Sequence, residues 1–486
     1  MKASARPTAS TSPPSSDMIS LGLSRITRLL QALRSPQYIT PVVHIAGTNG
    51  KGSVSAYLAS VLHAANLRVG RFNSPHLVDE WDCIRLKEEV VEESVFRKMK
   101  TEVEEVNRRE GLQATPFEVL TATAFSLFAR AKLDVAVVEV GMGGEGDATN
   151  VVPASKTLLS VLTAVDLDHQ GFLGNTVEAI ARVKSGIVRQ GGDLVLSRQA
   201  YPEVLNVAKS VAESRNATVW QAGQGHYTQT STTNCSASPQ QASIPLEPLC
   251  TFPESNSSIL PSSSSVDPAT INASLPLPGS YQLDNSATAT LAVQLLRNLP
   301  RATQMAPQLA SITNAAIREG IERTRWDGRL QWLDYSRQRE KSREKFNSSR
   351  QRILLDGAHN PSSASLLASY LSSIPPSQQP TTLVIGLSAP RAPSDVLTPL
   401  LKLSTGIKKV VCVEFSPPAG MPWVRPTSSD DLYRSVMELG ITDITVSKYV
   451  NVEEAFAKGI ETGEETIIVA GSLYLVADAL RMVRRT

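Results

Sequence analysis

The segment HIAGTNGKGS, residues 44–53, contains residue types that bind phosphate groups. Gly47 and Gly50 permit a tight turn, Lys51 supplies a positive charge, and a serine hydroxyl follows two residues later. The usual phosphate-binding loop has a glycine five residues before its Gly-Lys pair, but Ile45 occupies that position here. An apolar segment precedes the loop and a helical pattern follows it, so backbone amides at a helix N-terminus would face the phosphate. The sequence therefore predicts a shortened phosphate-binding loop, with a flexible turn as the alternative.

Two more polar residues follow apolar segments that are predicted to be strands. Glu139 lies in the strand segment LDVAVVE, and His169 comes soon after TLLSVLTAV. A buried carboxylate is costly unless it meets a cation or hydrogen-bond donors, and a metal ion beside the phosphate loop would supply the cation. Both side chains would then share a crevice at the carboxyl ends of the strands. The alternatives are that Glu139 caps a backbone turn and that His169 has a structural role.

Two predicted helices carry polar residues next to their apolar stripes. In TVEAIARVKSGIV, Lys184 lies beside the apolar stripe, and the alternative is an ordinary solvent-exposed lysine. In TPFEVLTATAFSLFARA, Thr115 and Glu118 are spaced as a capping box at the helix start. Thr121 has no such role, so we interpret its hydroxyl as a candidate to face a ligand pocket.

The order of these elements predicts the fold class. Short apolar segments alternate with helical patterns from Val42 onward, which is typical of a mostly parallel sheet covered by helices. RILLDG, TTLVIGL, KKVVCVEF and ETIIVAG continue the alternation and predict a second α/β unit. We therefore predict a disordered tail at residues 1–18, a central domain at 19–325 and a C-terminal domain at 326–486.

Two segments interrupt the alternation. Residues from about 224 to 274 are rich in Ser, Thr, Pro and Gln, and residues 336–352 are a run of charges. Such compositions bury too little apolar surface to fold alone. We predict that both are surface insertions and that the first contributes no core.

Composition limits the classes of function. The chain has 486 residues, enough for two or three domains, and a formal charge of +2, which gives no reason to expect nucleic acid or an anionic membrane as partner. No apolar segment approaches the roughly 20 residues needed to span a bilayer. Four scattered cysteines fit a reducing compartment better than a disulfide scaffold or a zinc site. We expect a soluble, monomeric, cytoplasmic protein, and the tail leaves a mitochondrial fraction open.

A series of motifs then runs through the chain in one order. They are HIAGTNGKGS, FNSPHL, TPFEVLTATAF, EVGMGGEGDATN, DHQGFLGNTVEAIARVKSGI, YQLDNSATA, WDGRLQ, LLDGAHNPSSA and AGSLYLVADAL. This series resembles that of the folylpolyglutamate synthase and dihydrofolate synthase branch of the Mur ligases, from about Leu21 to the C-terminus. LGLSRITRLL and AGMPW are similar to the fungal members of the dihydrofolate synthase group.

The resemblance implies an architecture and a reaction. The architecture is a P-loop-type, mostly parallel ATPase domain followed by a smaller Rossmann-like α/β domain. The reaction is the ATP-dependent joining of L-glutamate to 7,8-dihydropteroate through an acyl phosphate. The nearest alternative is the addition of glutamate to tetrahydrofolate, and alternatives from other classes are a P-loop small-molecule kinase and a non-catalytic nucleotide-binding relative.

The resemblance also implies roles for single residues. Lys51, Lys184, His169 and Glu139 would be catalytic. ATP would be bound by Thr48, Asn49, Gly50, Lys51, Gly52, Ser53, Asn285, Arg329, Asp356 and His359. Two Mg²⁺ ions would be held by Ser53, Ser74, Glu139, His169 and Lys184, the last as a carbamate. The pterin would lie near Gly22, Arg25, Glu118 and Thr121.

Three positions depart from the family pattern. Glu145 stands where the family's EVGLGGRLDATN has arginine, and Val183 stands where EKAGI has glutamate. Both changes remove or reverse a charge near the expected site. In GLSAPRAPSD, where many relatives have a Lys-Asp pair, we interpret Asp395 as the one residue that could replace it.

Overall fold

The structure is a computed structural model that describes residues 22–228, 239–254, 269–335, 351–403, 406–418, 420–421, 424–460 and 466–485. The predicted N-terminal tail, the middle of the first predicted insertion and nearly all of the second lie outside these residues. So do three residues of the AGMPW segment: Ala419, Pro422 and Trp423.

A nine-stranded sheet forms the first unit, with the strand order β11-β8-β7-β6-β1-β5-β2-β3-β4. Its six neighbouring strands from β8 to β2 are parallel, and antiparallel strands complete both edges. The bounds are β1 Val42–Ala46, β2 Val69–Phe72, β3 Ile84–Leu86, β4 Glu89–Val90, β5 Val135–Glu139, β6 Thr157–Leu162, β7 Asp193–Leu196, β8 Thr218–Ala222 and β11 Pro248–Phe252. Every residue of β1, β2, β5 and β6 is buried, as expected of parallel strands covered on both faces.

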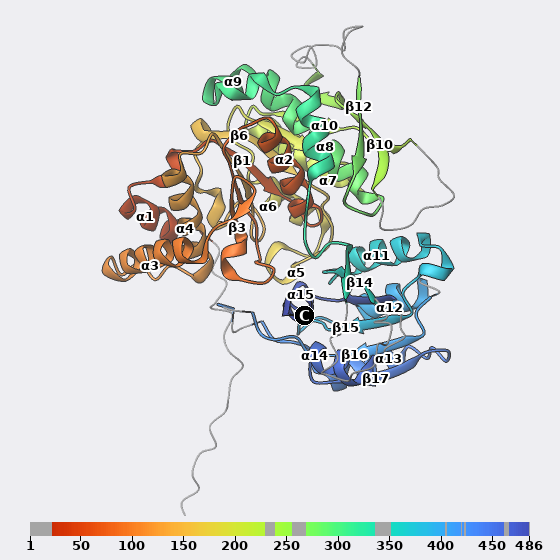
Figure 1. The fold of residues 1–486 in the computed structure, drawn as a ribbon. Helices are drawn as coiled ribbons and strands as arrows, with labels where there is room; N and C mark the ends of the chain where they lie inside the picture. Colours follow the sequence, from red (N-terminus) through yellow and green to blue (C-terminus); the bar gives the residue numbers. More distant parts are fainter. Residues whose placement is uncertain are drawn as a thin grey trace, which may run out of the picture.

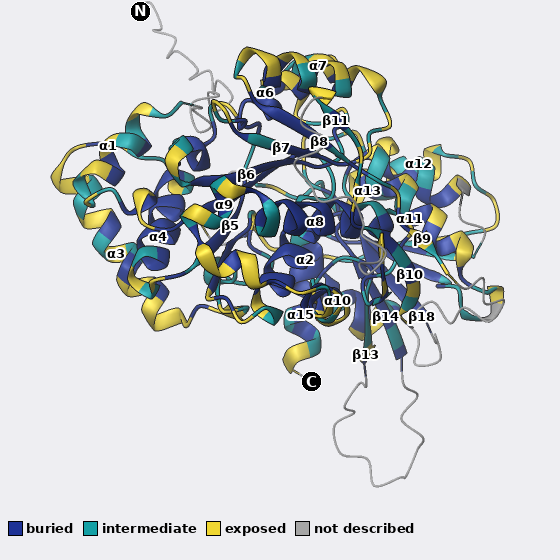
Figure 2. Cartoon of the chain, turned by 90° about the horizontal axis from the view of Figure 1, so that it is seen from above, coloured by how far each residue is buried: buried dark blue, intermediate teal, exposed yellow. Residues whose placement is uncertain are grey.

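Helices cover both faces of this sheet because its strands alternate apolar side chains between two cores. Val43 and Ile45 of β1 join a core with α2, α8 and α10, whereas Val42 joins a core with α1, α3 and α4 on the other face. Helices α6 and α7 extend the second face, and Figure 2 shows the buried strands between partly exposed helices. The bounds are α1 Ser24–Ala32, α2 Lys51–Ala64, α3 Glu93–Arg109, α4 Pro116–Ala131, α5 Gln170–Leu173, α6 Val177–Ser185, α7 Pro202–Ser214, α8 Tyr281–Asn298, α9 Pro300–Met305 and α10 Asn314–Arg323.

The first predicted insertion contains strands that belong to the core, so the expectation that it adds no core is wrong. A small antiparallel sheet has the order β12-β10-β9, with β9 His226–Tyr227, β10 Gln240–Pro245 and β12 Thr270–Leu275. Ala242 and Ile244 of β10 and Ile271 of β12 are buried in the core that contains α2 and α8. These strands alternate apolar residues with polar ones, which lowers their mean apolar content, so composition does not distinguish them from the polar segment around them.

A six-stranded sheet forms the second unit, with the order β13-β14-β18-β15-β16-β17. Strand β13 is antiparallel to β14, and the other pairs are parallel. The bounds are β13 Gln331–Tyr335, β14 Gln351–Asp356, β15 Thr382–Ile385, β16 Lys409–Cys412, β17 Thr445–Lys448, β18 Thr466–Ala470, α11 Pro361–Ser373, α12 Ser394–Leu403, α13 Ser429–Glu438, α14 Val452–Glu454 and α15 Leu473–Arg485. The sheet has a core on each face, with α11 to α13 on one and α14 and α15 on the other.

The two units follow each other along the chain and make direct contacts. Figure 1 shows the first unit in red to green and the second in cyan to blue. The predicted boundary between residues 325 and 326 falls between α10 and β13. The prediction of a mostly parallel α/β fold in two units is confirmed. No helix in the described ranges combines the length and apolar character that a bilayer span requires.

Candidate active site

The shortened phosphate-binding loop connects β1 to α2, and close packing explains its glycines. Gly50 is the N-cap of α2 with a left-handed φ of 91°. A Cβ atom at Gly47 would lie 1.9 Å from Thr163 Oγ1, and one at Gly50 would lie 2.5 Å from Asn285 Oδ1. Neither position tolerates a side chain, because contacts below 3 Å require neighbouring atoms to move. The loop therefore packs against the residue that follows β6 and against α8, and Asn285, one of the residues predicted to bind ATP, lies beside it.

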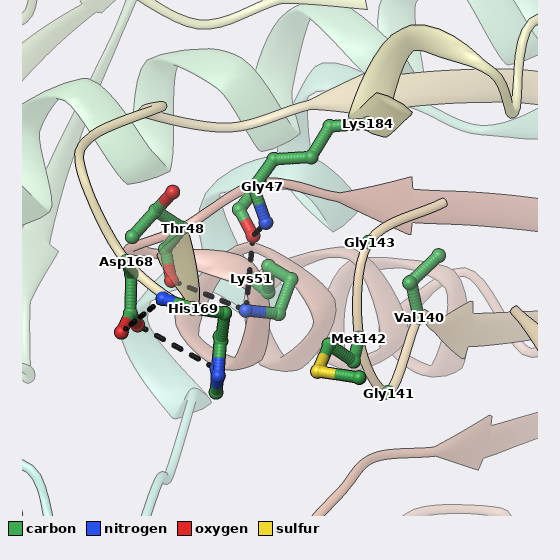
Figure 3. A pocket seen from close by; sticks show the side chains of 10 residues that line it. All are labelled: Gly47, Thr48, Lys51, Val140, Gly141, Met142, Gly143, Asp168, His169 and Lys184. Atoms are coloured by element: carbon green, nitrogen blue, oxygen red, sulfur yellow. Dashed lines mark hydrogen bonds and ion pairs between the residues drawn. The ribbon is translucent and has the colours of Figure 1, made fainter. Parts of the chain in front are cut away.

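Two lysines converge on this loop. Lys51 Nζ donates hydrogen bonds of 3.1 Å to the carbonyl oxygens of Gly47 and Thr48, and Lys184 Nζ donates one of 2.9 Å to that of Gly47. Figure 3 shows both side chains pointing toward Gly47. Lys184 is 3% exposed, so the alternative of a solvent-exposed lysine is wrong. Burial, with help from the positive charge of Lys51, lowers the pKa of Lys184 to about 7.

A pocket opens beside these lysines at the carboxyl ends of the strands (Figure 3). Its lining residues are Gly47, Thr48, Lys51, Val140, Gly141, Met142, Gly143, Asp168, His169 and Lys184. Four of them, Thr48, Lys51, His169 and Lys184, were predicted as site residues. Asp168 was not, although its place next to the histidine in DLDHQ was a signal that could have found it.

Oxygen donors of the predicted metal set lie next to the loop. Glu139 Oε1 is 3.9 Å from Lys51 Nζ, and its Oε2 accepts a hydrogen bond of 2.6 Å from Asn73 Nδ2. Ser53 Oγ accepts one of 3.3 Å from Gln282. Ser74 Oγ is buried and has no hydrogen-bond partner among the described residues. An unsatisfied hydroxyl together with a buried carboxylate fits a hard cation, since Mg²⁺ prefers oxygen ligands.

The carboxylate of Glu139 is buried, so its pKa depends on burial and on the groups around it. Burial raises the pKa of Glu139, and Lys51 and the Asn73 amide act against this effect. Asn73 follows β2 and was not predicted as a site residue. Within the described part of the chain, no three His, Cys, Asp or Glu side chains gather into a metal-binding group. The predicted metal set therefore depends on serine hydroxyls and on modification of Lys184.

His169 is held at the pocket by its neighbour. It is the N-cap of α5 with a left-handed φ of 53°, and its backbone N–H donates a 2.9 Å hydrogen bond to Asp168 Oδ1. Its ring Nε2 lies 3.7 Å from Asp168 Oδ2. Partial burial lowers the pKa of His169, whose side chain is 40% exposed, and this favours the neutral ring that can bind a metal. Burial opposes ionisation of Asp168, but the charges of His169, Arg391 and His359 lower its pKa overall.

The second unit carries the other residues that were predicted to bind ATP. Asp356 Oδ2 accepts the backbone N–H of Leu330 and its Oδ1 accepts that of Ala358, both at 2.9 Å. Burial raises the pKa of Asp356, and the charge of Arg329 acts against this. Burial also lowers the pKa of His359 to about 4. The two units are joined directly here, because Asn49 Nδ2 donates a 3.3 Å hydrogen bond to Ser362 Oγ.

The residues predicted near a pterin form a separate cluster. Arg25 Nε is 3.0 Å from Glu118 Oε2, and Gly22 N donates to the carbonyl oxygen of Gly146 at 3.1 Å. The capping box of Thr115 and Glu118 is confirmed. Thr121 is fully buried, and its hydroxyl donates to the carbonyl oxygen of Phe117 at 2.8 Å. The hydroxyl thus has a partner in its own helix, which contradicts the reason for placing it at a pocket.

Two of the three departures from the family pattern lie side by side. The backbone N–H of Glu145 donates a 3.0 Å hydrogen bond to the carbonyl oxygen of Val183, while the Glu145 side chain is exposed. At the third departure, Asp395 is exposed in the first turn of α12, whereas Arg391 reaches the pocket residue Asp168 at 3.3 Å. Asp395 does not line the pocket, so its role as the replacement stays a prediction, and Arg391 was not predicted.

Comparisons with known proteins agree with this geometry. Residues 45–293 match the family model "Mur ligase middle domain" and residues 331–482 match "Dihydrofolate synthetase, C-terminal domain". The dihydrofolate synthetase of Saccharomyces cerevisiae is 32% identical, and the alignment covers 96% of this chain and 98% of the relative. The probable dihydrofolate synthetase of Schizosaccharomyces pombe is 31% identical, with 96% and 99% covered.

Solved structures show the same architecture. FolC of Escherichia coli in complex with DHPP and ADP matches with a TM-score of 0.72 and 27% identity, covering 97% of this chain and 96% of that one. The folylpolyglutamate synthase of Mycobacterium tuberculosis complexed with ADP and AMPPCP matches with a TM-score of 0.74 and 25% identity, covering 96% of each.

Fold and site together define an ATP-dependent ligase of the Mur ligase type. Within that class, the chain belongs to the family of dihydrofolate synthetases and folylpolyglutamate synthases, which act in folate synthesis. The predicted family and enzyme class are thereby confirmed.

Proposed function

We propose that this protein joins L-glutamate to 7,8-dihydropteroate and converts ATP to ADP and phosphate, giving 7,8-dihydrofolate. The observation that carries the proposal is the convergence of Lys51, Lys184 and His169 at the phosphate-binding loop. Similarity to two dihydrofolate synthetases along almost the whole chain supports dihydropteroate as the acceptor.

The reaction requires that ATP, the carboxylate of the acceptor and the amine of glutamate are held in line. A carboxylate is a poor electrophile, so its oxygen first attacks the γ-phosphorus of ATP, forming an acyl phosphate and releasing ADP. The amine of glutamate then attacks the acyl carbon, and phosphate leaves as the amide forms. Positioning supplies much of the rate in such reactions. The pocket is lined by the first unit, and closure of the second unit over it would hold the reactants together and keep water from the acyl phosphate.

The phosphate chain of ATP would lie across the loop. The backbone at Thr48 to Ser53 and the ammonium of Lys51 would bind the phosphates at the N-terminus of α2. Asn285 lies next to Gly50 and would contact the nucleotide from the first unit. From the second unit, Arg329, Asp356 and His359 would complete the ATP site. Asp356 already fixes two backbone amides of this region, so its carboxylate also orders the loop after β14.

Ser53, Ser74, Glu139 and His169 would hold the Mg²⁺ ions, and the metal would neutralise negative charge on the transferring phosphoryl group. Ser74 supplies the unsatisfied hydroxyl and Glu139 the buried carboxylate. Lys184 would join this set as a carbamate, which converts its positive charge into a negative one. Its amine is suited to react with CO₂ because burial keeps a large fraction of it neutral near pH 7.

The pterin would lie between α4 and the start of α1. Arg25 and Glu118 connect these two elements, and Gly22 is tied to the glycine-rich segment after β5. Thr121 lies on α4 next to this region, and we still propose that it lies near the pterin. Its hydroxyl donates a hydrogen bond within α4 and not to the ligand. We also propose that the enzyme is cytoplasmic and that it is a monomer. Light scattering of the purified protein would test the monomeric state.

A second function has its own support. The Bacillus subtilis relative named dihydrofolate synthase/folylpolyglutamate synthase is 31% identical over 71% of this chain. Its name combines both activities, so addition of glutamate to tetrahydrofolate is the alternative.

One assay separates these functions. The full-length protein is supplied with ATP, Mg²⁺ and L-glutamate, and ADP release is measured with dihydropteroate or with tetrahydrofolate. Turnover with dihydropteroate alone supports the proposal, and turnover with tetrahydrofolate moves the protein to the polyglutamate activity. ADP release without glutamate would indicate a kinase, and nucleotide binding without turnover would indicate a non-catalytic relative.

A further inference from the structure

Arg391 joins three loops that meet at the pocket. It lies between β15 and α12 in the second unit, in the segment GLSAPRAPSD. Its Nη2 is 3.3 Å from Asp168 Oδ1 in the first unit, and its Nη1 donates a 2.6 Å hydrogen bond to the carbonyl oxygen of His359. One guanidinium thus connects its own loop to the loop after β14 and to the loop after β6.

The Asp168 carboxylate, which Arg391 contacts, also contacts both the backbone and the ring of His169. Its Oδ1 accepts the backbone N–H of His169 at 2.9 Å, and its Oδ2 lies 3.7 Å from the ring Nε2. The Asp168 side chain is 11% exposed, so few water molecules compete for it. His169 has a φ of 53°, a conformation that costs a non-glycine residue free energy and persists where the surroundings fix it. Asp168 contributes to this restraint through its hydrogen bond to the backbone N–H of His169, together with the hydrogen bonds of Phe172 and Leu173 to the His169 carbonyl oxygen.

We propose that Arg391 is a positioning residue through which the second unit fixes His169 at the phosphate-binding pocket. This inference rests on the proposed function for the role of His169. The guanidinium orients Asp168, Asp168 orients both the backbone and the ring of His169, and His169 faces Lys51 and Lys184 across the pocket. The site is therefore fully ordered where the second unit is in contact with the first.

The chemistry of arginine fits this role better than that of lysine. A guanidinium has donors that point in fixed directions, so Arg391 can bind a carboxylate and a carbonyl oxygen at once. An ammonium is a single charged centre on a flexible stem and would hold one of the two partners well. The Arg391 side chain is also one third exposed. It therefore lies at the surface where the two units meet, with one partner in each unit.

The test uses the full-length protein and three substitutions. Arg391→Gln should lower kcat by about 10-fold to 100-fold, as loss of an outer-shell partner commonly does, while the KM for the acceptor changes little. Arg391→Lys should recover part of kcat. Asp168→Asn combined with Arg391→Gln should be no worse than Asp168→Asn alone, because both act through one pathway. Arg434→Gln is the matched control, since Arg434 is exposed on α13 and pairs with Asp431 on the same helix.

A second readout does not depend on turnover. Hydrogen exchange of the peptide spanning residues 166–174 should be faster in Arg391→Gln than in the wild type, whereas β1 should be unchanged. The kcat values of the variants and the wild type are compared with the acceptor that the wild type uses. If the wild type is silent with both acceptors, the proposed function fails and exchange alone decides the inference. A kcat within about twofold of wild type, unchanged exchange, or an effect confined to the KM for ATP would overturn it.

Discussion

The ammonium group of Lys184 donates a 2.9 Å hydrogen bond to the carbonyl oxygen of Gly47, so helix α6 is tied to the phosphate-binding loop. Lys51 donates to the same oxygen at 3.1 Å. Two positive charges this close repel each other, and Lys184 is 3% exposed. A buried lysine beside a second lysine costs stability. The carbamate proposed for Lys184 would explain why the protein keeps a residue that is unfavourable for the fold.

Replacing Lys184 should therefore separate activity from stability. Lys184→Met should lower turnover on the order of 100-fold, because the proposed carbamate and its metal affinity are lost. ADP binding should be retained, since the phosphate-binding loop is intact. Steady-state kinetics with and without added bicarbonate measure the first effect, and calorimetric titration of ADP measures the second. Turnover that is insensitive to both substitution and bicarbonate would contradict the carbamate.

The same variant should be more stable than the wild type in a pH-dependent way. The pKa of Lys184 is lowered from 10.5 to about 7 in the folded protein. Below pH 7 the folded protein therefore carries the full cost of a buried charge, and this cost shrinks as the pH rises toward 10.5, where the unfolded chain also loses its proton. The stability advantage of Lys184→Met should be largest below pH 7 and fall between pH 7 and 10.5. Urea unfolding in CO₂-free buffers measures it, and a constant advantage would refute the pKa shift.

The two adjacent departures from the family pattern should be coupled. Glu145 and Val183 are joined by a backbone hydrogen bond of 3.0 Å, so the family's arginine and glutamate would be neighbours here. Val183→Glu alone places a second carboxylate beside Glu145 and should lower kcat/KM. Adding Glu145→Arg should restore it, with a coupling energy of about 1 kcal/mol. Strictly additive effects in this double-mutant cycle would show that the positions act independently.

The sequence was sufficient to predict what depends on local pattern. A strand, a glycine-containing loop and a helix place Lys51 in the same way in many folds, and the capping box of Thr115 and Glu118 is set within four residues. Side chains that meet only through tertiary contacts were harder to predict. Asn73, Asp168 and Arg391 come from three loops distant in sequence, and no spacing rule relates them.

Strands β10 and β12 show a second limit. Their apolar residues are few and alternate with Ser, Gln, Thr and Asn, so composition alone indicates a polar insertion. Pairing with each other and packing on α8 make the same residues part of a core. Tertiary contacts therefore decided the structure of this segment against its composition.

The core role of β10 gives a stability prediction. Ile244 is fully buried between this small sheet and the core that contains α2 and α8. Ile244→Ala should lower the free energy of unfolding by about 2–5 kcal/mol, because apolar contacts are lost and a cavity remains. Ser243→Ala is the control, since the next residue along the strand faces the other side. Urea unfolding compares the two variants, and equal midpoints would restore the view of a segment without core.

The indole ring of Trp326, which lies between α10 and β13, packs closely against the backbone of Gly52 in the first turn of α2. A Cβ atom at Gly52 would lie 2.5 Å from Trp326 Cζ2, and the Arg71 guanidinium lies 5.1 Å from the ring centroid on Trp326. Gly52→Ala should thus push the indole away and disturb the phosphate-binding loop, at a cost of about 1–3 kcal/mol. We expect the KM for ATP to rise about tenfold, which corresponds to roughly 1.4 kcal/mol.

A second substitution tests whether the clash with Trp326 is the cause. Trp326→Phe removes one ring of the indole and should restore part of the affinity for ATP in the Gly52→Ala background, while it weakens ATP binding modestly on its own. The KM for ATP in the four proteins of this cycle measures the effect. If Trp326→Phe makes Gly52→Ala worse by the same factor as it affects the wild type, the glycine is required by the nucleotide itself and not by the packing of Trp326 on the loop.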